Sequence, residues 1–590
     1  MTEKGRQLPL FDVQGWENSK TMKEEKLTLR YNLFDLPTAQ HKAGLAGLLV
    51  MIESLKRRGA GPLPEVSELG ATEATITVTR QSLQVLLDDL FAAEVVEVLV
   101  KNKWQNKKPK EIKEIEVEEK GKKKKEKRFL YDIIQPKGLF LKTFFPDSND
   151  GWIQLWRNML WNILRAQPAT RKIYEEMVDS QHSSVSSKIF PALTKENQKK
   201  GGNYFKESIA GSVFVGAQEK NAELVSFVGR PSHNFLLHFW HIVSFIFIPR
   251  TFIFKRAKDS SGKITWNDQG FTLVIPEPSD LPWFKEDIIE AMQRLNTELA
   301  GKSNKPRQAM IDLSEEGGLE YLYHLAKYRT QQQGIDECIS CVEVYHVQRV
   351  DKNVRMLAAN RLIPDQYVLD HYERIRSRRM NPIFKSIVLP NILNQTPWYL
   401  GSMNKLASFP VELLVQAQGR TPANMPCFSR DARKKFTDIQ HELKDMEEAE
   451  MKTEEGRDAL LASRLYNMIR QYIRFKAEKK SGVELKNHKK EIDGKVIYEY
   501  PGNYREAVEK VSMDAFLAMR GRRDQDFVEY FTGAICSIPH FLPQEEYHLV
   551  AGALLDDWEK VKSLSMLAIS AASYLPGAVT DENNNNGEKS

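Results

Sequence analysis

The sequence lacks the short motifs by which common enzymes bind phosphate or activate a nucleophile. It contains no GxxxxGK[ST] phosphate loop, because Gly301-Lys302-Ser303 has no glycine at the required upstream position. It also has no HExxH zinc motif, no GxSxG elbow and no GxGxxG after an expected strand. Catalysis by dispersed residues stays open, but these absences favour a binding protein over an enzyme, and we expect no cofactor.

Cysteine is scarce, and long apolar runs are absent. Four cysteines in 590 residues give no disulfide framework, which is typical of a reducing cytoplasm. The most apolar segment, Phe235–Phe254, is interrupted by histidines, a proline and an arginine, so we expect no membrane span. The N-terminal segment up to Lys20 lacks the apolar core of a signal peptide. We therefore expect a cytoplasmic protein.

The sequence offers only weak candidates for a metal site. Cys338 and Cys341 form a CxxC with His346 nearby, but a zinc site needs a fourth ligand and preferably a second paired motif. We expect these thiols to pack in a core. His238 and His241 flank a tryptophan in a very apolar run, so we expect buried structural histidines.

The length requires more than one domain. The order of strand and helix patterns predicts an α+β protein: a mixed α/β N-terminal body with β-hairpins, followed by an all-α C-terminal helical bundle. The expected divisions are a polar tail (1–25), an α+β unit with a Lys-rich hairpin (26–150), a mixed body (151–420), a helical domain (431–578) and a disordered tail (579–590). After about Asp351 we expect the sequence to turn helical, with an insertion between two helices at 483–503 that is a candidate β-hairpin.

The net charge of +6 permits nucleic-acid binding without requiring it, so local clusters matter more. Val95–Lys101 and Arg128–Ile134 are expected to form the arms of a long hairpin. Its tip carries an unbroken basic run, Lys122, Lys123, Lys124 and Lys125. The run is either a solvated excursion or a mobile finger that contacts a phosphate backbone without base specificity.

The Gly211–Trp240 stretch has apolar runs broken by glycines, which predicts short strands joined by tight turns. Its polar side chains are of the types that pair with a base edge: Gln218, Asn221, Arg230 and Asn234. A basic loop with Lys199 and Lys200 lies upstream and suits contact with a DNA backbone. The alternative is an ordinary loop whose amides satisfy its own backbone.

A third basic cluster lies on an expected helix, Ser463–Lys480. Its basic residues Arg464, Arg470, Arg474 and Lys476 alternate with tyrosine and phenylalanine, and Leu465, Met468 and Ile469 would form the buried stripe. Arg470 and Arg474 are one turn apart and share a face. The cluster is either a solvated helix face or a track for a displaced single strand.

Several segments resemble one known family in the expected order along the chain. The Gly211–Trp240 stretch resembles the large subunit of a type I CRISPR interference complex (Cascade), of the I-B kind and the Myxan lineage. So do five further segments: Leu27–Ile52, Tyr131–Leu141, Leu155–Arg171, Pro306–Leu322 and Phe527–Tyr547. None of them is a catalytic signature.

The resemblance implies a non-enzymatic subunit beside the crRNA handle. Such a subunit recognises a protospacer-adjacent motif (PAM) in double-stranded target DNA, separates the strands for R-loop formation and docks a helicase-nuclease. The guide RNA supplies sequence specificity, a division of labour known from another CRISPR effector. The implied partners are crRNA, target DNA, the handle-binding, backbone and small subunits of Cascade, and the helicase-nuclease.

Other functions fit the sequence as well. A transposon-coupled Cascade would dock transposition proteins instead, a processing enzyme would use a dispersed site, and a scaffold would bind only proteins. The family resemblance also implies a small subunit made by internal translation, and Met446 or Met451 opens a suitable helical segment.

Overall fold

The computed structural model describes the chain in ranges that leave out both ends and several loops. The described residues are 25–105, 107–119, 122–145, 150–163, 167–180, 182–198, 206–209, 213–215, 227–256, 262–300, 304–329, 334–350, 353–377, 379–416, 425–492, 495–538 and 544–576. Both expected terminal tails therefore lie outside this part, apart from Glu25. Contacts divide the chain into two units, made of Met1–Ile248, Gly270–Met310 and Glu320–Pro364, and of Pro249–Gln269, Ile311–Leu319 and Asp365–Ser590.

Helix α1 (Ala39–Arg57) is the core of the first unit. Thr38 caps its N-terminus, since the Thr38 side chain accepts a hydrogen bond from the His41 backbone N–H. The helix is buried on almost all sides, in keeping with its apolar sequence. It packs against η2 (Trp240–Ile242), α7 (Pro231–Leu236), α8 (Leu281–Arg294) and β11 (Phe271–Pro278). A Cβ at Gly44 or Gly47 would lie 2.2 or 2.1 Å from a backbone oxygen of Leu236 or Phe239, so only glycine permits this close approach.

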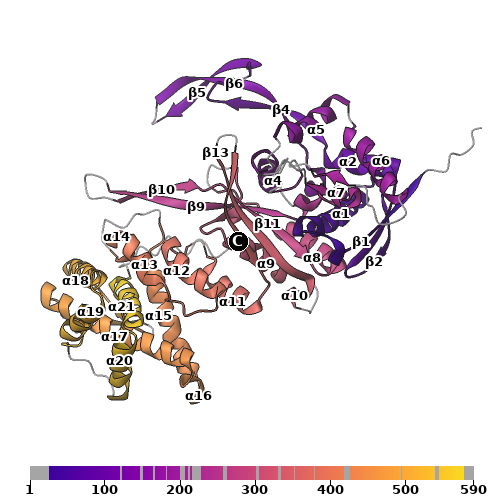
Figure 1. Ribbon diagram of the computed structural model, residues 1–590. Helices are drawn as coiled ribbons and strands as arrows, with labels where there is room; N and C mark the ends of the chain where they lie inside the picture. The colour runs from indigo at the N-terminus through magenta and orange to yellow at the C-terminus, as the bar shows by residue number, and fades with distance from the viewer. Residues whose placement is uncertain are drawn as a thin grey trace, which may run out of the picture. The chain divides into compact units, whose positions relative to one another are not determined.

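The antiparallel sheets of the first unit account for most of the strands (Figure 1). One sheet has the order β1-β3-β2, with β1 Lys26–Asn32, β2 Glu65–Leu69 and β3 Glu73–Thr79. Another runs from the first half of β9 (Phe245–Arg256) through β11 and β13 (Ile339–Val350) to β14 (Asn353–Leu362). β14 corrects the expectation that the sequence turns helical directly after Asp351. It is an edge strand with exposed Met356 and Leu357, and apolar and polar residues do not alternate along its sequence.

A three-stranded ribbon replaces the expected simple hairpin. β4 (Ala93–Val100) pairs with β6 (Lys122–Pro136), as the sequence predicts, but β5 (Glu111–Glu119) pairs along the outer half of β6. The segment expected to be a free tip is therefore largely strand.

The first unit has further elements outside these sheets. They are α2 Arg80–Leu90, α3 Leu139–Lys142, α4 Gly151–Asn162, α5 Gln167–Ser180, α6 Ser184–Gln198, β7 Glu207–Ser208, β8 Val228–Gly229, η3 Arg307–Ala309 and α10 Ile335–Cys338, with η1 Leu33–Asp35. The chain passes between the units within β12 (Met310–Ile311) and α9 (Glu316–Lys327).

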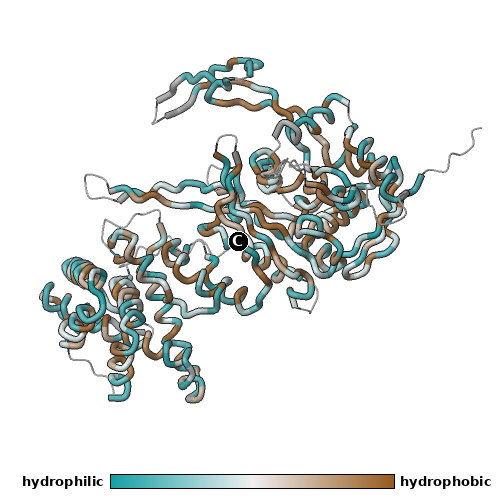
Figure 2. The backbone as a smooth tube through the Cα atoms, viewed as in Figure 1, coloured by the Kyte–Doolittle hydropathy of each residue, from teal (hydrophilic) through white to brown (hydrophobic). Residues whose placement is uncertain are grey.

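The second unit is mostly helical. Its helices show alternating hydrophilic and hydrophobic segments in Figure 2, as amphipathic helices packed side by side do. The elements are α11 Gln366–Ile375, α12 Pro382–Leu393, α13 Ser402–Ser408, α14 Val411–Leu414, α15 Phe428–Asp445, α16 Glu448–Met451, α17 Glu454–Ser481, α18 Gly502–Arg520, α19 Asp524–Tyr530, the π-helix η5 Phe531–Ile535, α20 Gln544–Asp556 and α21 Trp558–Ser573. The mixed α+β composition with helices toward the C-terminus is thus as expected.

The second unit is not entirely helical, because it contains two β-hairpins. The outer half of β9 pairs with β10 (Gly262–Asp268). Between α17 and α18, η4 (Leu485–His488) leads into a second hairpin of β15 (Lys489–Ile492) and β16 (Lys495–Tyr498).

Candidate nucleic-acid interfaces

The Gly211–Asn234 segment is anchored at both of its ends. At the first end, the Gln40 side chain exchanges two hydrogen bonds with the Val215 backbone, of 3.1 and 2.9 Å. The indole N–H of Trp240 donates to the Val213 carbonyl at 2.7 Å. At the other end, β8 pairs with β7, and the Ile209 N–H donates to the Phe227 carbonyl at 2.8 Å. The first anchor rests on the buried core around α1, because Gln40 and Trp240 are buried there.

Two of the four candidate base-contacting residues lie in the described part of this segment. Arg230 is half-buried and precedes the first turn of α7, while Asn234 lies within that helix. Of the expected short strands, β8 covers part of the Phe227–Val228 run, Val213–Val215 forms turns instead, and a helix follows from Pro231. The Leu224–Val225 run lies outside the described residues. Gln218 and Asn221 lie outside the described residues, as do Lys199 and Lys200.

The Asn234 amide is already engaged within the fold. Its Nδ2 donates to the Glu207 carbonyl at 3.2 Å, and its Oδ1 is buried. That oxygen would lie 2.3 Å from a Cβ placed on Gly229. Asn234 therefore holds the β7–β8 pair against α7, the local structural role that asparagine often has in loops.

The basic run on β6 faces an acidic strand. Lys122, Lys123 and Lys125 stand opposite Glu119, Glu118 and Glu116 of β5, and Lys124 stands opposite Val117. Opposite charges at paired strand positions attract one another. The lysines are therefore carried on a strand whose paired neighbour is acidic.

The four basic residues of α17 point in different directions. Arg464 forms an ion pair with Glu546 of α20. Lys476 is exposed, and its Nζ lies 5.9 Å from the Tyr472 ring centroid. Arg470 and Arg474 share a face, as their spacing predicts, and both line one pocket. Leu465, Met468 and Ile469 are buried, as expected.

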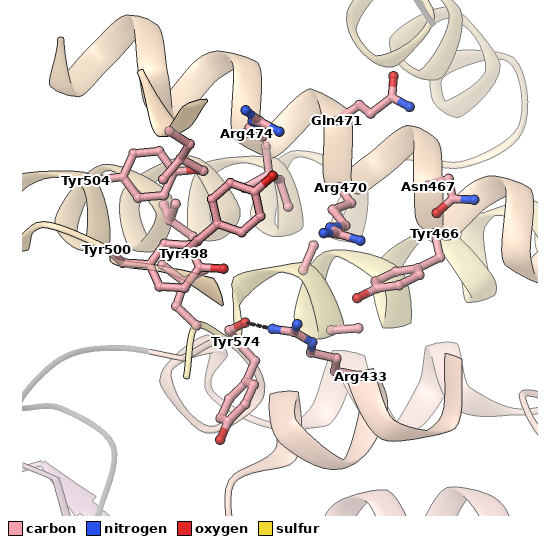
Figure 3. Close-up of a pocket in the computed structure, with 16 residues that line it drawn as sticks. Arg433, Tyr466, Asn467, Arg470, Gln471, Arg474, Tyr498, Tyr500, Tyr504 and Tyr574 are labelled. Atoms are coloured by element: carbon pink, nitrogen blue, oxygen red, sulfur yellow. Dashed lines mark hydrogen bonds between the residues drawn. The ribbon is translucent and has the colours of Figure 1, made fainter. Parts of the chain in front are cut away.

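This pocket has a volume of about 220 Å³ and lies within the second unit. We call it the arginine–tyrosine pocket, after the side chains that dominate its lining: Arg433, Arg470, Arg474, Tyr466, Tyr498, Tyr500, Tyr504 and Tyr574. Figure 3 shows Arg470 between Tyr466 on one side and Tyr498, Tyr500 and Tyr504 on the other. Most of these residues do not stand out as a site in the sequence. The signal that could have found them is the cluster of tyrosines in YEYPGNY (498–504) within a charged insertion.

The histidines and cysteines that resembled metal ligands are core residues, as expected. Burial lowers the pKa of His238 to about 4 and that of His241 to about 3, so both rings are neutral at physiological pH. His241 Nδ1 accepts a hydrogen bond of 3.0 Å from the Trp156 indole. Cys338 and Cys341 are buried, and burial raises the pKa of the Cys341 thiol to about 11.

Within the described ranges, no three His, Cys, Asp or Glu side chains gather as a metal site would require. Among the helices that the structure describes, none has the length and apolar character needed to cross a bilayer.

Comparison with known proteins places the chain in one family. The N-terminal domain model of type I-B CRISPR Cas8b matches residues 63–335, and the C-terminal domain model of the same family matches residues 339–572. No curated protein matches the chain. The two domain models together cover most of the sequence in their natural order, so the chain belongs to the Cas8b family of type I-B CRISPR large subunits.

Proposed function

We propose that this large subunit recognises a short protospacer-adjacent motif in duplex DNA, promotes strand separation and R-loop formation, and docks a helicase-nuclease. The observation that carries the proposal is the anchored Gly211–Asn234 segment. Its described end residues are held by Gln40, Trp240 and the β7–β8 pair, which supports the proposal that the segment has a rigid support. A rigid support of this kind holds an amide at a base edge at little entropic cost.

In this proposal Gln218, Asn221 and Arg230 contact base edges, and Lys199 and Lys200 contact the backbone beside them. Lys122 to Lys125 add a second backbone contact that carries no base specificity. Arg470 and Arg474, with Lys476 further along α17, contact the displaced strand. The partners are crRNA, target DNA, the remaining Cascade subunits and the helicase-nuclease.

The proposed subunit has no catalytic role. The purified chain is expected neither to hydrolyse ATP nor to cut DNA, since its sequence contains no phosphate loop. Turnover that survives repurification and is lost on a point substitution in this chain would contradict this part of the proposal.

The motif assignment is tested by measuring affinity for duplexes with randomised flanks, assembled with guide RNA, at several salt concentrations. Gln218→Ala and Asn221→Ala are expected to cost about 1–3 kcal/mol on the preferred motif and to relax discrimination. Lys199→Ala with Lys200→Ala should weaken all duplexes alike and reduce the salt dependence. Lys405→Ala, an exposed lysine on α13, is the control. If the amide variants discriminate motifs as well as the parent does, the assignment is wrong.

A further inference from the structure

The arginine–tyrosine pocket is assembled from five separate parts of the second unit. α17 contributes Arg470 and Arg474, and the insertion with the β15–β16 hairpin contributes Tyr498 and Tyr500. α18 contributes Tyr504, while Arg433 of α15 and Tyr574 after α21 complete the lining. We propose that this pocket receives one unpaired nucleobase of a single strand, with the adjoining phosphate on Arg470 and Arg474. The inference deepens the proposed contact with the displaced strand and rests on it.

The charge of the lining favours an anionic ligand. Three arginines line the pocket, and no aspartate or glutamate does. Arg433 is already engaged, because its Nη1 donates to the Tyr574 carbonyl at 2.8 Å. Arg474 pairs with Glu478 at 3.0 Å, yet its side chain is 43% exposed. Among the residues that the structure describes, no carboxylate forms an ion pair with the exposed Arg470. Arg470 is therefore the cation best placed to meet a phosphate.

The aromatic side chains favour a planar group next to that anion. Tyr498 and Tyr500 are stacked with ring centroids 6.5 Å apart, and Tyr500 and Tyr504 with centroids 6.1 Å apart. Arg505 lies over the Tyr500 ring at 5.4 Å and fixes its orientation. A phosphate alone would not need these rings, whereas a base stacks on tyrosine and keeps its phosphate within reach of arginine.

The size of the pocket limits the ligand. About 220 Å³ is below the roughly 300–1,000 Å³ typical of pockets for small molecules, so the pocket suits one base with part of its sugar. A base pair within a duplex cannot enter, because its stacking faces and pairing edge are already occupied. Unpaired nucleic acid is the ligand that combines a single accessible base with a regularly spaced phosphate.

Binding of fluorescein-labelled single-stranded DNA to the full chain tests the proposal. The probes are an oligothymidine of about 16 nucleotides and an abasic strand of equal length, which keeps the phosphates and lacks the bases. The variants are Arg470→Gln and Tyr500→Leu. Arg457→Gln is the matched control, because Arg457 is an exposed arginine on the same helix, about 20 Å away along its axis. Circular dichroism verifies that each variant is folded.

The parent should bind the intact strand about tenfold more tightly than the abasic strand. Tyr500→Leu should remove most of this preference, and Arg470→Gln should weaken both strands about tenfold and lower the salt slope by about 0.7. Equal binding of the two strands by the parent would reveal a phosphate site only and would overturn the proposal. The proposal would also fail if Arg470→Gln bound both strands as tightly as the control variant Arg457→Gln does.

This experiment separates the pocket from motif recognition. Motif discrimination is assigned to the Gly211–Asn234 segment of the first unit and is measured on duplexes. If discrimination fails while the base preference and its loss in Tyr500→Leu are observed, the motif assignment fails and the pocket stands. If Gln218→Ala relaxes discrimination but the parent shows no base preference, the pocket fails and the motif assignment stands.

Discussion

Gln40 and Val215, 175 positions apart in the chain, are joined by a reciprocal pair of hydrogen bonds. The Gln40 amide nitrogen donates to the Val215 carbonyl at 3.1 Å, and its oxygen accepts from the Val215 N–H at 2.9 Å. The side-chain amide thus supplies both hydrogen-bond partners of the Val215 backbone, as a neighbouring strand would. Because Gln40 is buried on α1, the bonds fix one end of the Gly211–Asn234 segment to the core.

The first prediction concerns this anchor. Gln40→Leu replaces the amide with an apolar side chain of similar size. It leaves the Val215 N–H and carbonyl unpaired, which should lower the free energy of unfolding by about 1–3 kcal/mol. We expect motif discrimination on duplex DNA to fall while α1 stays folded, since the Thr38 cap is unchanged. Limited proteolysis should cut the segment faster. Gln366→Leu, which loses only a surface bond to Asp370, is the control. Unchanged discrimination with faster proteolysis would show that the anchor does not serve recognition.

The second prediction concerns the charges of the β5–β6 ribbon. Replacing Lys122 to Lys125 with glutamine should weaken binding to every duplex alike and reduce its salt dependence. Replacing the facing Glu116, Glu118 and Glu119 with glutamine should have the opposite effect, because the lysines lose their competing partners. Both variants are compared by fluorescence anisotropy at several salt concentrations. If neither changes DNA affinity and both lower the melting temperature, the charges serve only to pair the strands.

The third prediction concerns a buried ion cluster in the second unit. Lys385 is 2% exposed and contacts Asp312 at 2.8 Å and Glu316 at 3.0 Å. Arg250 also contacts Asp312, at 3.2 Å. Lys385→Met leaves the Glu316 carboxylate buried without its cation, so the free energy of unfolding should fall by about 3–5 kcal/mol near neutral pH. Denaturant titration measures this loss.

The pH dependence of that loss follows from Glu316. Burial raises the pKa of Glu316 above its ordinary value, so the folded state favours the protonated acid. A group whose folded pKa is raised contributes stability below its unfolded pKa and loses it as pH rises through the folded value. Removing Lys385 raises the folded pKa further, so the deficit of Lys385→Met should be largest near neutral pH and smaller near pH about 4. A deficit independent of pH would point to lost packing instead.

The sequence predicts elements best where burial imposes a period. The apolar stripe of α17 and the pairing of β4 with β6 follow from spacing alone, because each buries one face. β5 was missed because its sequence, EIKEIEVEE, is dominated by charge and is held mainly by pairing with β6. β14 was missed because an edge strand with exposed Met356 and Leu357 carries no alternating pattern.

The candidate sites show the same contrast between what local spacing predicts and what only the fold determines. The i,i+4 spacing of Arg470 and Arg474 predicts their shared face, since helix geometry is local. The pocket around them depends on Arg433 and Tyr574, which are 141 positions apart in sequence. No local pattern encodes such a contact. Asn234 shows the converse: its residue type suits base contact, but its partner, the Glu207 carbonyl, is visible only in the fold.

The fourth prediction concerns the proposed separate C-terminal product. α15 lies before Met446, yet it packs on α17 and α21. Phe436 of α15 is fully buried and stacks on Tyr466 of α17, with ring centroids 4.8 Å apart. A product that begins at Met446 therefore lacks a helix that covers part of its core. A product that begins at Met425 retains it.

We expect Met425–Ser590 to unfold cooperatively, and Met446–Ser590 to be helical but to unfold at lower denaturant concentration. Loss of a buried phenylalanine alone costs about 3–5 kcal/mol, and α15 supplies further apolar contacts. Circular dichroism during urea titration of both products measures the difference.

For internal translation, Met446→Leu and Met451→Leu should each be tested for loss of a short co-purifying species, whose mass identifies its first residue. Met425→Leu is the matched control for these two substitutions. Equal stability of the two products would show that α15 is dispensable. A disordered Met446–Ser590, together with the absence of any short species, would leave a C-terminal domain and no separate subunit.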